Sequence, residues 1–375
     1  MVLLDSIVEE AAVKAKEVLH VCSTPNGLYA SGGKDGYTSV WARDSMVSLI
    51  GASAATGEFG KVFAKSLNTL KSHQSAKGQI PNCVDMFEKR RLVTFATLDS
   101  SLWYILGEHF YKKRFGPAVW KGHKKNIDAA LGWVSFQDSG EDMLPEQQPT
   151  SDWQDCFPHK YGHTINTQAL YFAALNAAGK KKGLNKYVRQ VNNYLWSDEL
   201  GYYLPWHWKD HGKYSEKEKW FDSLGNVLAI VFGLANKRQA GSILDFIGQN
   251  GVARPFPLQA IYPAIAPNAK EWKDYFLASL AGKKHQYLNG GIWPFIGGFY
   301  VCALVHAGRL AAARDELELL ATSNSLGKKF AWDFNEWIHP VTGIPSGGRH
   351  QSWSAGAYLL AFEAVKSREN ILKFK

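Results

Sequence analysis

Apolar residues recur at intervals of three and four along most of the chain, which is the spacing of an amphipathic α-helix. Stretches that alternate apolar and polar residues, as strands do, are few and short. The chain is therefore predicted to be nearly all α. The windows with helical spacing are 4–20, 42–56, 58–73, 95–112, 118–136, 164–179, 184–196, 221–235, 237–249, 269–281, 294–308, 309–323 and 351–367.

The connections between these windows are rich in glycine, proline and tryptophan, and no low-complexity linker interrupts the chain. This organisation predicts one domain over residues 1–375, built from stacked helical hairpins. No sequence repeat of fixed period is present, which argues against a solenoid. A closed ring of antiparallel helix pairs fits the length.

Polar and aromatic residues gather where helices are predicted to start. If alternate helix starts point to one end of a ring, these clusters converge there. The clusters are "YTSVWARDS" (37–45), "FATLDSSLW" (95–103), "SDWQDC" (151–156), "KWFDSLGN" (219–226), "LNGGIWPF" (288–295), "FNEWIHPVTG" (334–343) and "RHQSWSAG" (349–356).

The 14 Trp, 16 Tyr and 20 Phe make up 13% of the chain, and flat amphipathic rings suit the faces of sugars as well as large cores. The net charge of +9 raises the question of nucleic acid, but the lysines are scattered or form short runs such as 179–183. Without a long basic stretch interleaved with aromatics, we expect no nucleic-acid partner. A solvated basic surface explains the charge.

Four cysteines, Cys22, Cys83, Cys156 and Cys302, match neither a zinc spacing nor a dense disulfide framework. Cys156 has two interpretations, a nucleophile or a small buried thiol, and the second is the commoner. The first 19 residues predict an amphipathic helix without the apolar core of a signal peptide. No stretch is long and apolar enough to span a bilayer, so we expect a cytoplasmic protein without a membrane partner.

In "TSDWQDC", Asp152 and Asp155 stand three positions apart on either side of Trp153. On a helical turn both carboxyls would lie on one face and raise each other's pKa. A carboxyl that stays protonated near neutral pH is what a glycosidase needs to protonate a leaving oxygen. Asp152 alternatively caps a helix.

Taken singly, the other motifs also have structural interpretations. Asp44 in "WARDS" can stabilise a helix terminus, and Arg43 can pair with any carboxylate. Glu336, between Asn335 and Trp337, is either a partly desolvated base or a loop residue facing water. In "NGGIWPF", two glycines allow close approach of the backbone to a ligand, and tight helix packing is the alternative.

In this order, the clusters resemble the six-hairpin (α/α)6 glycoside hydrolases from about residue 37 to 366. One similar family is the amylo-α-1,6-glucosidase domain of glycogen debranching enzymes, through "WARDSMVSL", "TLDSSLW", "DWQDC", "NGGIWPF" and "RHQSWSAGAYLL". The other is the alkaline/neutral invertases, through "DSLGNVLAIVFGLA" (222–235) and "WDFNEWIHPVTGIPSG". The ordered set is specific, whereas each motif alone is weak.

The resemblance implies an inverting hydrolase in which Asp155 is the general acid and Glu336 the general base, with carboxyls about 6.5 to 9.5 Å apart. It implies no metal or organic cofactor. Arg43 and Asp44 match residues that hold hydroxyls of the terminal sugar. The remaining candidates are Trp41, Trp153, Trp293 and Trp353 as pocket walls, and Asp99, Asp222, Asn289 and Gln351 as polar supports.

The chain departs from both families at Asn166, where an acidic residue is frequent, and it lacks the large amino-terminal domain of debranching enzymes. A pocket-shaped, exo-acting site for small-molecule saccharides is therefore expected, releasing glucose from α-linked oligosaccharides. Two alternatives stay open: an invertase that splits sucrose, and a non-catalytic sugar-binding protein.

Overall fold

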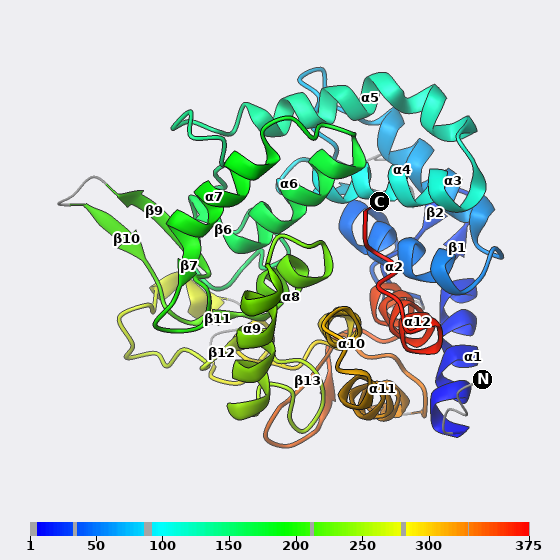
Figure 1. The fold of residues 1–375 in the computed structure, drawn as a ribbon. Coiled ribbons are helices and arrows are strands. Elements are labelled where there is room, and N and C mark those ends of the chain that lie inside the picture. Colours follow the sequence, from blue (N-terminus) through cyan, green and yellow to red (C-terminus); the bar gives the residue numbers. More distant parts are fainter. Residues whose placement is uncertain are drawn as a thin grey trace.

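Twelve α-helices in two concentric layers form the framework of the structure, a computed structural model that describes residues 6–32, 36–85, 92–210, 214–278, 283–328 and 330–374 (Figure 1). The inner layer consists of α2 (Ala42–Ala55), α4 (Asp99–Phe115), α6 (Ile165–Ala177), α8 (Ser223–Val231), α10 (Pro294–His306) and α12 (Ser352–Ser367). The outer layer consists of α1 (Ser6–Cys22), α3 (Gly60–Ser72), α5 (Ala118–Ser135), α7 (Leu184–Leu195), α9 (Lys237–Gln249) and α11 (Leu310–Ser325).

The inner helices form a closed ring. Each packs against the next inner helix along the chain, and α12 returns to pack against α2. On the outside, α1 lies against α11 and α12 and covers the seam where the ring closes, with the Tyr358 hydroxyl donating to the Val8 carbonyl oxygen at 2.8 Å. The fold is the predicted (α/α)6 toroid.

Sequence explains which helices lie inside. The segment of α10, "PFIGGFYVCALVH", is buried from Pro294 to Val305 without a polar face, as expected for a helix surrounded by others. By contrast, α7 buries only Tyr187, Val191 and Leu195, a single stripe at four-residue spacing. Helices buried on all sides, such as α10, line the ring, and helices with one buried stripe, such as α7, cover it.

Small residues let the inner helices approach closely. A side chain at Gly51 of α2 would overlap the backbone of Gly356 on α12. A Cβ atom at Gly298 of α10 would lie 2.5 Å from the carbonyl oxygen of Ala357 on α12. These contacts bring α2, α10 and α12 together at one side of the ring.

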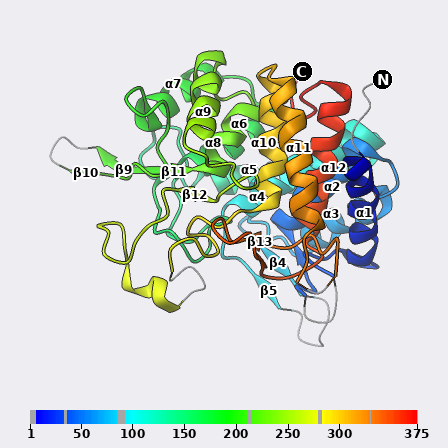
Figure 2. The same cartoon turned by 90° about the horizontal axis from the view of Figure 1, so that it is seen from below.

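Strands in the described residues are two to five residues long and pair only antiparallel, in the orders β1-β2, β3-β4-β5, β10-β9-β6, β7-β8, β11-β12 and β13-β14. Figure 2 shows β4, β5 and β13 together at one end of the helices. The strands are β1 (Ser23–Thr24), β2 (Gly27–Leu28), β3 (Val40–Trp41), β4 (Cys83–Val84), β5 (Val93–Thr94), β6 (His163–Thr164), β7 (Trp196–Ser197), β8 (Tyr202–Tyr203), β9 (Trp206–Asp210), β10 (Ser215–Lys217), β11 (Phe221–Asp222), β12 (Ile261–Tyr262), β13 (Trp337–Ile338) and β14 (Pro345–Ser346).

Three local predictions are wrong. The cluster at 334–343 does not start a helix, because it contains β13 and α12 begins only at Ser352. Window 269–281 contains only the 3-10 helix η1 (Asp274–Ala278), because this segment is held by the buried Phe276 ring against Phe157 rather than by an apolar stripe; residues 279–282 lie outside the described part. The segment 151–162 is a loop, not a helix start, since α6 begins only at Ile165. None of the described helices has the length and apolar character needed to cross a membrane.

Candidate active site

A cavity of about 450 Å³, including its opening to solvent, lies where α2, α10 and α12 begin. The inner helices all start at this end of the ring, so residues distant in sequence converge here. Tyr37, Tyr287 and Ala30 complete the wall. The predicted site residues that line the cavity are Trp41, Arg43, Asp44, Trp153, Asp155, Trp293, Glu336, Gln351 and Trp353.

Glu336 is held firmly in the cavity wall, immediately before β13. It is 5% exposed, and the Gly348 amide donates to its Oε2 atom at 2.8 Å. A Cβ atom at Gly347, where φ is +74°, would lie 2.6 Å from the Glu336 Cβ. Two glycines after β14 therefore let the backbone close around this carboxylate.

Tyr287 and Tyr37 direct their hydroxyls toward the other oxygen of Glu336, Oε1, at 3.4 and 3.5 Å. Burial raises the pKa of Glu336, while the Gly348 amide and the two tyrosine hydroxyls lower it and the charge of Asp155 raises it. The carboxyl is thus a stronger base than one in water, yet it keeps donors that stabilise its charged form.

Asp155 projects from the 151–162 loop at the cavity mouth, where the residue as a whole is exposed. The protein around its carboxyl removes water and raises the pKa of Asp155; Arg43 opposes this effect, and the negative charge of Asp152 adds to it. Among the described residues no hydrogen bond joins the Asp155 and Glu336 carboxyls, although their charges act on each other.

Lys160 anchors the loop that carries Asp155. Its ammonium group, with no exposed surface, lies 2.8 Å from Asp152 Oδ2 and 3.1 Å from Asp222 Oδ2, and donates to Gln154 Oε1 at 2.5 Å. Asp152 also accepts from the Gln154 amide at 2.9 Å. One buried lysine therefore holds both Asp152 and Gln154, the residues on either side of Trp153.

Arg43 and Asp44 enter the cavity from the first turn of α2. Arg43 Nη1 lies 3.0 Å from Asp99 Oδ2, and Arg43 Nε lies 3.9 Å from Asp44 Oδ2. Burial raises the pKa of Asp44 to about 6, against the opposing charge of Arg43. The ion pair with Asp99 fixes the Arg43 guanidinium group, and the Nε atom of this group faces Asp44.

Several buried donors of the wall have no partner among the described residues. A buried donor without an acceptor is costly, so such groups usually serve a ligand or water. Their side chains line one cavity, which suits a molecule covered with hydroxyl groups. The atoms are Trp41 Nε1, Arg43 Nε, Trp153 Nε1, Gln351 Nε2 and Trp353 Nε1.

Three predicted binding residues lie behind the cavity wall rather than in it. Asp99 holds Arg43, and Asp222 pairs with Lys160 while its Oδ1 caps α8 by accepting from the Gly225 amide at 3.1 Å. Asn289 exchanges hydrogen bonds with both backbone groups of Ile265, at 2.7 and 2.9 Å. Their positions are structural supports for residues nearer the cavity.

Sequence reasoning missed Tyr37, Tyr287, Gly347 and Lys160. Tyr37 is the first residue of the quoted "YTSVWARDS", and Gly347 is the last residue of the quoted "WDFNEWIHPVTGIPSG", so membership of these motifs was the available signal. Lys160 gave none, because its partners Asp152 and Asp222 are 8 and 62 residues away.

Cys22, Cys83 and Cys302 are buried free thiols and Cys156 is a partly exposed one. Burial raises the pKa of Cys22 and of Cys83 to about 12, which makes both poor nucleophiles. Within the described ranges no group of three or more His, Cys, Asp or Glu side chains is arranged to hold a metal ion.

The chain is similar in sequence to plant invertases. Residues 212–367 match the family described as "Alkaline and neutral invertase". The chain is 24% identical to neutral/alkaline invertase 1, mitochondrial, of Oryza sativa subsp. japonica over 70% of this chain and 50% of that protein. It is 25% identical to alkaline/neutral invertase E, chloroplastic, of Arabidopsis thaliana over 71% and 51%. The chain thus spans about half the length of these relatives.

Solved structures share the fold. A mannosylglycerate hydrolase from Thermus thermophilus, in complex with Tris and D-glycerate, superposes with a TM-score of 0.70 at 15% identity, over 93% of this chain and 99% of that one. A rhamnosidase from Klebsiella oxytoca with rhamnose bound gives a TM-score of 0.68 at 13% identity, over 97% and 64%.

Proposed function

We propose that this chain, which belongs to the six-hairpin (α/α)6 glycosidase superfamily, is an inverting glycoside hydrolase with Asp155 as general acid and Glu336 as general base. The observation that carries the proposal is that both carboxyls, about 180 residues apart in sequence, face one small cavity walled by tryptophans and unpartnered donors. A merely structural role for either carboxyl would not require this convergence.

In the proposed reaction, the Asp155 carboxyl gives its proton to the glycosidic oxygen as the bond from that oxygen to the anomeric carbon breaks. Glu336 accepts a proton from a water molecule, and the water oxygen bonds to the anomeric carbon on the opposite face. This water would bind in the cavity that both carboxyls line. The raised pKa of Asp155 favours the protonated form that the first step needs.

The site favours cleavage at a chain end. The cavity is lined by Trp41, Trp153, Trp293 and Trp353, and this aromatic wall suits one terminal sugar better than the middle of a polymer. Arg43 and Asp44 supply donors and an acceptor for the hydroxyls of that ring. We therefore propose exo-acting hydrolysis of short α-linked saccharides.

Two substrates compete within this class. The ordered motifs around Asp155 and Trp293 suggest release of glucose from α-1,6-linked oligosaccharides. The invertase match over 212–367, which includes Glu336, favours sucrose, and the named relatives are invertases. Of the two, we favour sucrose. The presence of both carboxyls in one cavity argues against the non-catalytic alternative.

The test is product release from sucrose, maltose, isomaltose, panose and trehalose, with the anomer of the first product followed by NMR. We expect cleavage with inversion, and losses of about 10²- to 10⁴-fold in Asp155→Asn and Glu336→Gln. Asp128→Asn, at an exposed ion pair, is the matched control and should keep full activity. Retention of configuration, or full activity in Asp155→Asn, would contradict the mechanism.

A further inference from the structure

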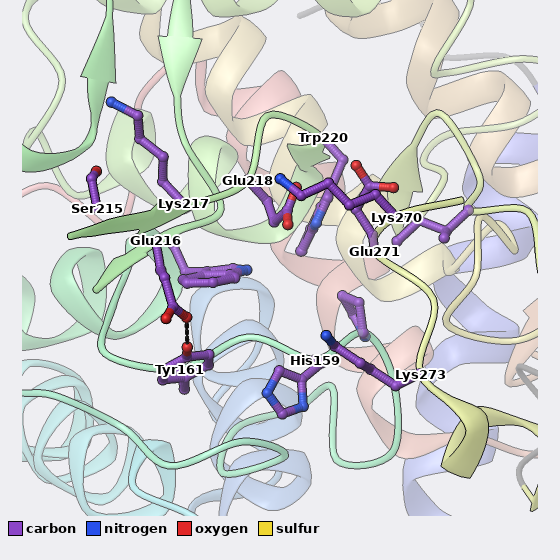
Figure 3. A pocket seen from close by; sticks show the side chains of 13 residues that line it. His159, Tyr161, Ser215, Glu216, Lys217, Glu218, Trp220, Lys270, Glu271 and Lys273 are labelled. Atoms are coloured by element: carbon purple, nitrogen blue, oxygen red, sulfur yellow. Dashed lines mark hydrogen bonds between the residues drawn. The ribbon is translucent and has the colours of Figure 1, made fainter. Parts of the chain in front are cut away.

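A second cavity, of about 730 Å³ including its opening to solvent, lies beside the loop that follows Asp155 (Figure 3). Three parts of the chain build it: the 158–161 part of that loop, Trp206 on β9 together with residues of 215–220, and residues between Ile265 and Lys273. None of its residues lines the first cavity, and neither the motifs nor the proposed mechanism uses it.

Aromatic side chains form part of its wall. The rings of Tyr161 and Trp206 are 4.7 Å apart at 32°. Trp206 is 5% exposed, and its Nε1 donor has no partner among the described residues. Trp220 is also buried and shares the wall. Flat rings with a polar edge bind ligands that have both apolar faces and hydroxyls.

Charged side chains of both signs line the rest. The glutamates are Glu216, Glu218 and Glu271, and the lysines are Lys217, Lys270 and Lys273. Figure 3 shows Lys217 and Glu216 on one side of the cavity and Lys270 and Glu271 on the other. Equal numbers of lysines and glutamates argue against a dedicated site for an anion or a cation, whereas together they donate to and accept from neutral hydroxyl groups.

The two cavities are linked by the chain itself. Pro158 begins the second wall three residues after Asp155, so their Cα atoms are at most about 11 Å apart. A second link runs from Tyr287, in the first wall, through Asn289 to Ile265, in the second. A general acid must face the leaving group, so the loop that carries Asp155 lies on the leaving side of the proposed substrate, and its residues 158, 159 and 161 belong to the second wall.

We propose that the second cavity is a saccharide-binding site for the leaving-group part of the substrate, extending recognition beyond the two sugars joined at the cleaved bond. The assignment of this cavity to the leaving-group side rests on the proposed function, in which Asp155 is the general acid. The ligand class, a neutral saccharide, follows from the aromatic and mixed-charge wall. If the second cavity binds saccharide, residues outside the first cavity determine the enzyme's preference for the length of its saccharide substrate.

The test measures binding by calorimetry in Asp155→Asn protein, whose turnover is expected to be at least about 100-fold slower than that of the wild type. Two matched pairs are used, isomaltose with panose and sucrose with 1-kestose, in which the trisaccharide adds one sugar on the leaving side. Ser215→Trp fills the second cavity from an exposed strand position. Lys237→Trp adds the same ring at an exposed position of α9 and is the control.

We expect one trisaccharide to bind at least about fivefold more tightly than its disaccharide, and Ser215→Trp to abolish this difference while disaccharide binding changes less than about twofold. Tyr161→Ala, which removes a ring without filling the cavity, should weaken the trisaccharide alone. The inference is overturned if neither trisaccharide binds more tightly than its disaccharide, or if Ser215→Trp and Tyr161→Ala leave the difference intact. Failure of hydrolysis in the wild type would instead count against the catalytic proposal, because binding is measured without turnover.

Discussion

Replacing Lys160 by methionine tests whether the buried ion cluster holds the loop of the proposed acid. The wild-type ammonium group has no exposed surface and contacts Asp152 at 2.8 Å, Asp222 at 3.1 Å and Gln154 at 2.5 Å. Methionine fills a similar volume but leaves two buried carboxylates without a cation. Removing one partner of a buried pair costs about 3–5 kcal/mol, so we expect a loss of that size in the free energy of unfolding.

The loss should also depend on pH. Burial raises the pKa of Asp222, and Lys160 opposes this. Without the lysine the folded-state pKa of Asp222 rises further above its unfolded value, so the folded state binds the proton more tightly. Stability of Lys160→Met therefore falls as pH rises from about 4 through that folded pKa, and the loss should be larger at pH 8 than at pH 5.

Urea unfolding at the two pH values, followed by tryptophan fluorescence, measures this loss. Lys219→Met is the control, since that lysine is exposed and 3.5 Å from Glu199, and it should change stability by no more than about 0.5 kcal/mol. Adding Asp152→Asn and Asp222→Asn to Lys160→Met should recover part of the loss, because asparagine still caps α8. A loss below about 1 kcal/mol in Lys160→Met would refute the reasoning.

Three further outcomes are expected. Tyr287→Phe removes a hydroxyl that lowers the pKa of Glu336, so the acidic limb of the pH–activity profile should move to higher pH; an unmoved limb would argue against Glu336 as the base. Gly347→Ala should reduce activity strongly by displacing Glu336, whereas Gly343→Ala, with a similar φ of +69° and open space around it, should cost about 1–2 kcal/mol of stability and keep activity. Gly122→Ala, at an exposed position inside α5 with nothing within 4 Å, should raise the free energy of unfolding by about 0.5–1 kcal/mol, and thermal denaturation that shows a decrease would contradict this.

The helices were predictable because the spacing of apolar residues within each segment indicates which of its faces are buried. Segments that are apolar all round, such as α10, and segments with one stripe, such as α7, differ visibly in sequence. The α-helix predicted over 269–281 is wrong because Phe276 fits the helical spacing of apolar residues but packs on Phe157, which is distant in sequence. The local pattern of apolar residues predicts a helix correctly where the buried side chains follow the helical period, and it fails where a single side chain packs on a distant segment.

The site was predictable through polar and aromatic motifs, some at helix starts and others, around Asp155 and Glu336, in loops. Arg43 and Trp353 stand in the first turns of inner helices, and the ring brings such turns to one end. The contacts of Asn289 were not predictable, because an amide that bonds to the backbone of Ile265 looks the same in sequence as one that binds a ligand. Lys160 was missed because a buried lysine is recognisable only by its distant partners.

The closure of the ring also sets the order in which the site comes into existence during synthesis. One wall of the first cavity begins with Arg43 on α2, and the opposite wall ends with Trp353 on α12, about 300 residues later. At ordinary translation speeds roughly 15 to 60 s separate the emergence of these two helices from the ribosome. Throughout that interval the face of α2 that packs on α12 is uncovered, which makes it a natural target for chaperones. A nascent chain that stops before α12 would carry both proposed catalytic carboxyls and still lack the cavity that lets them work together.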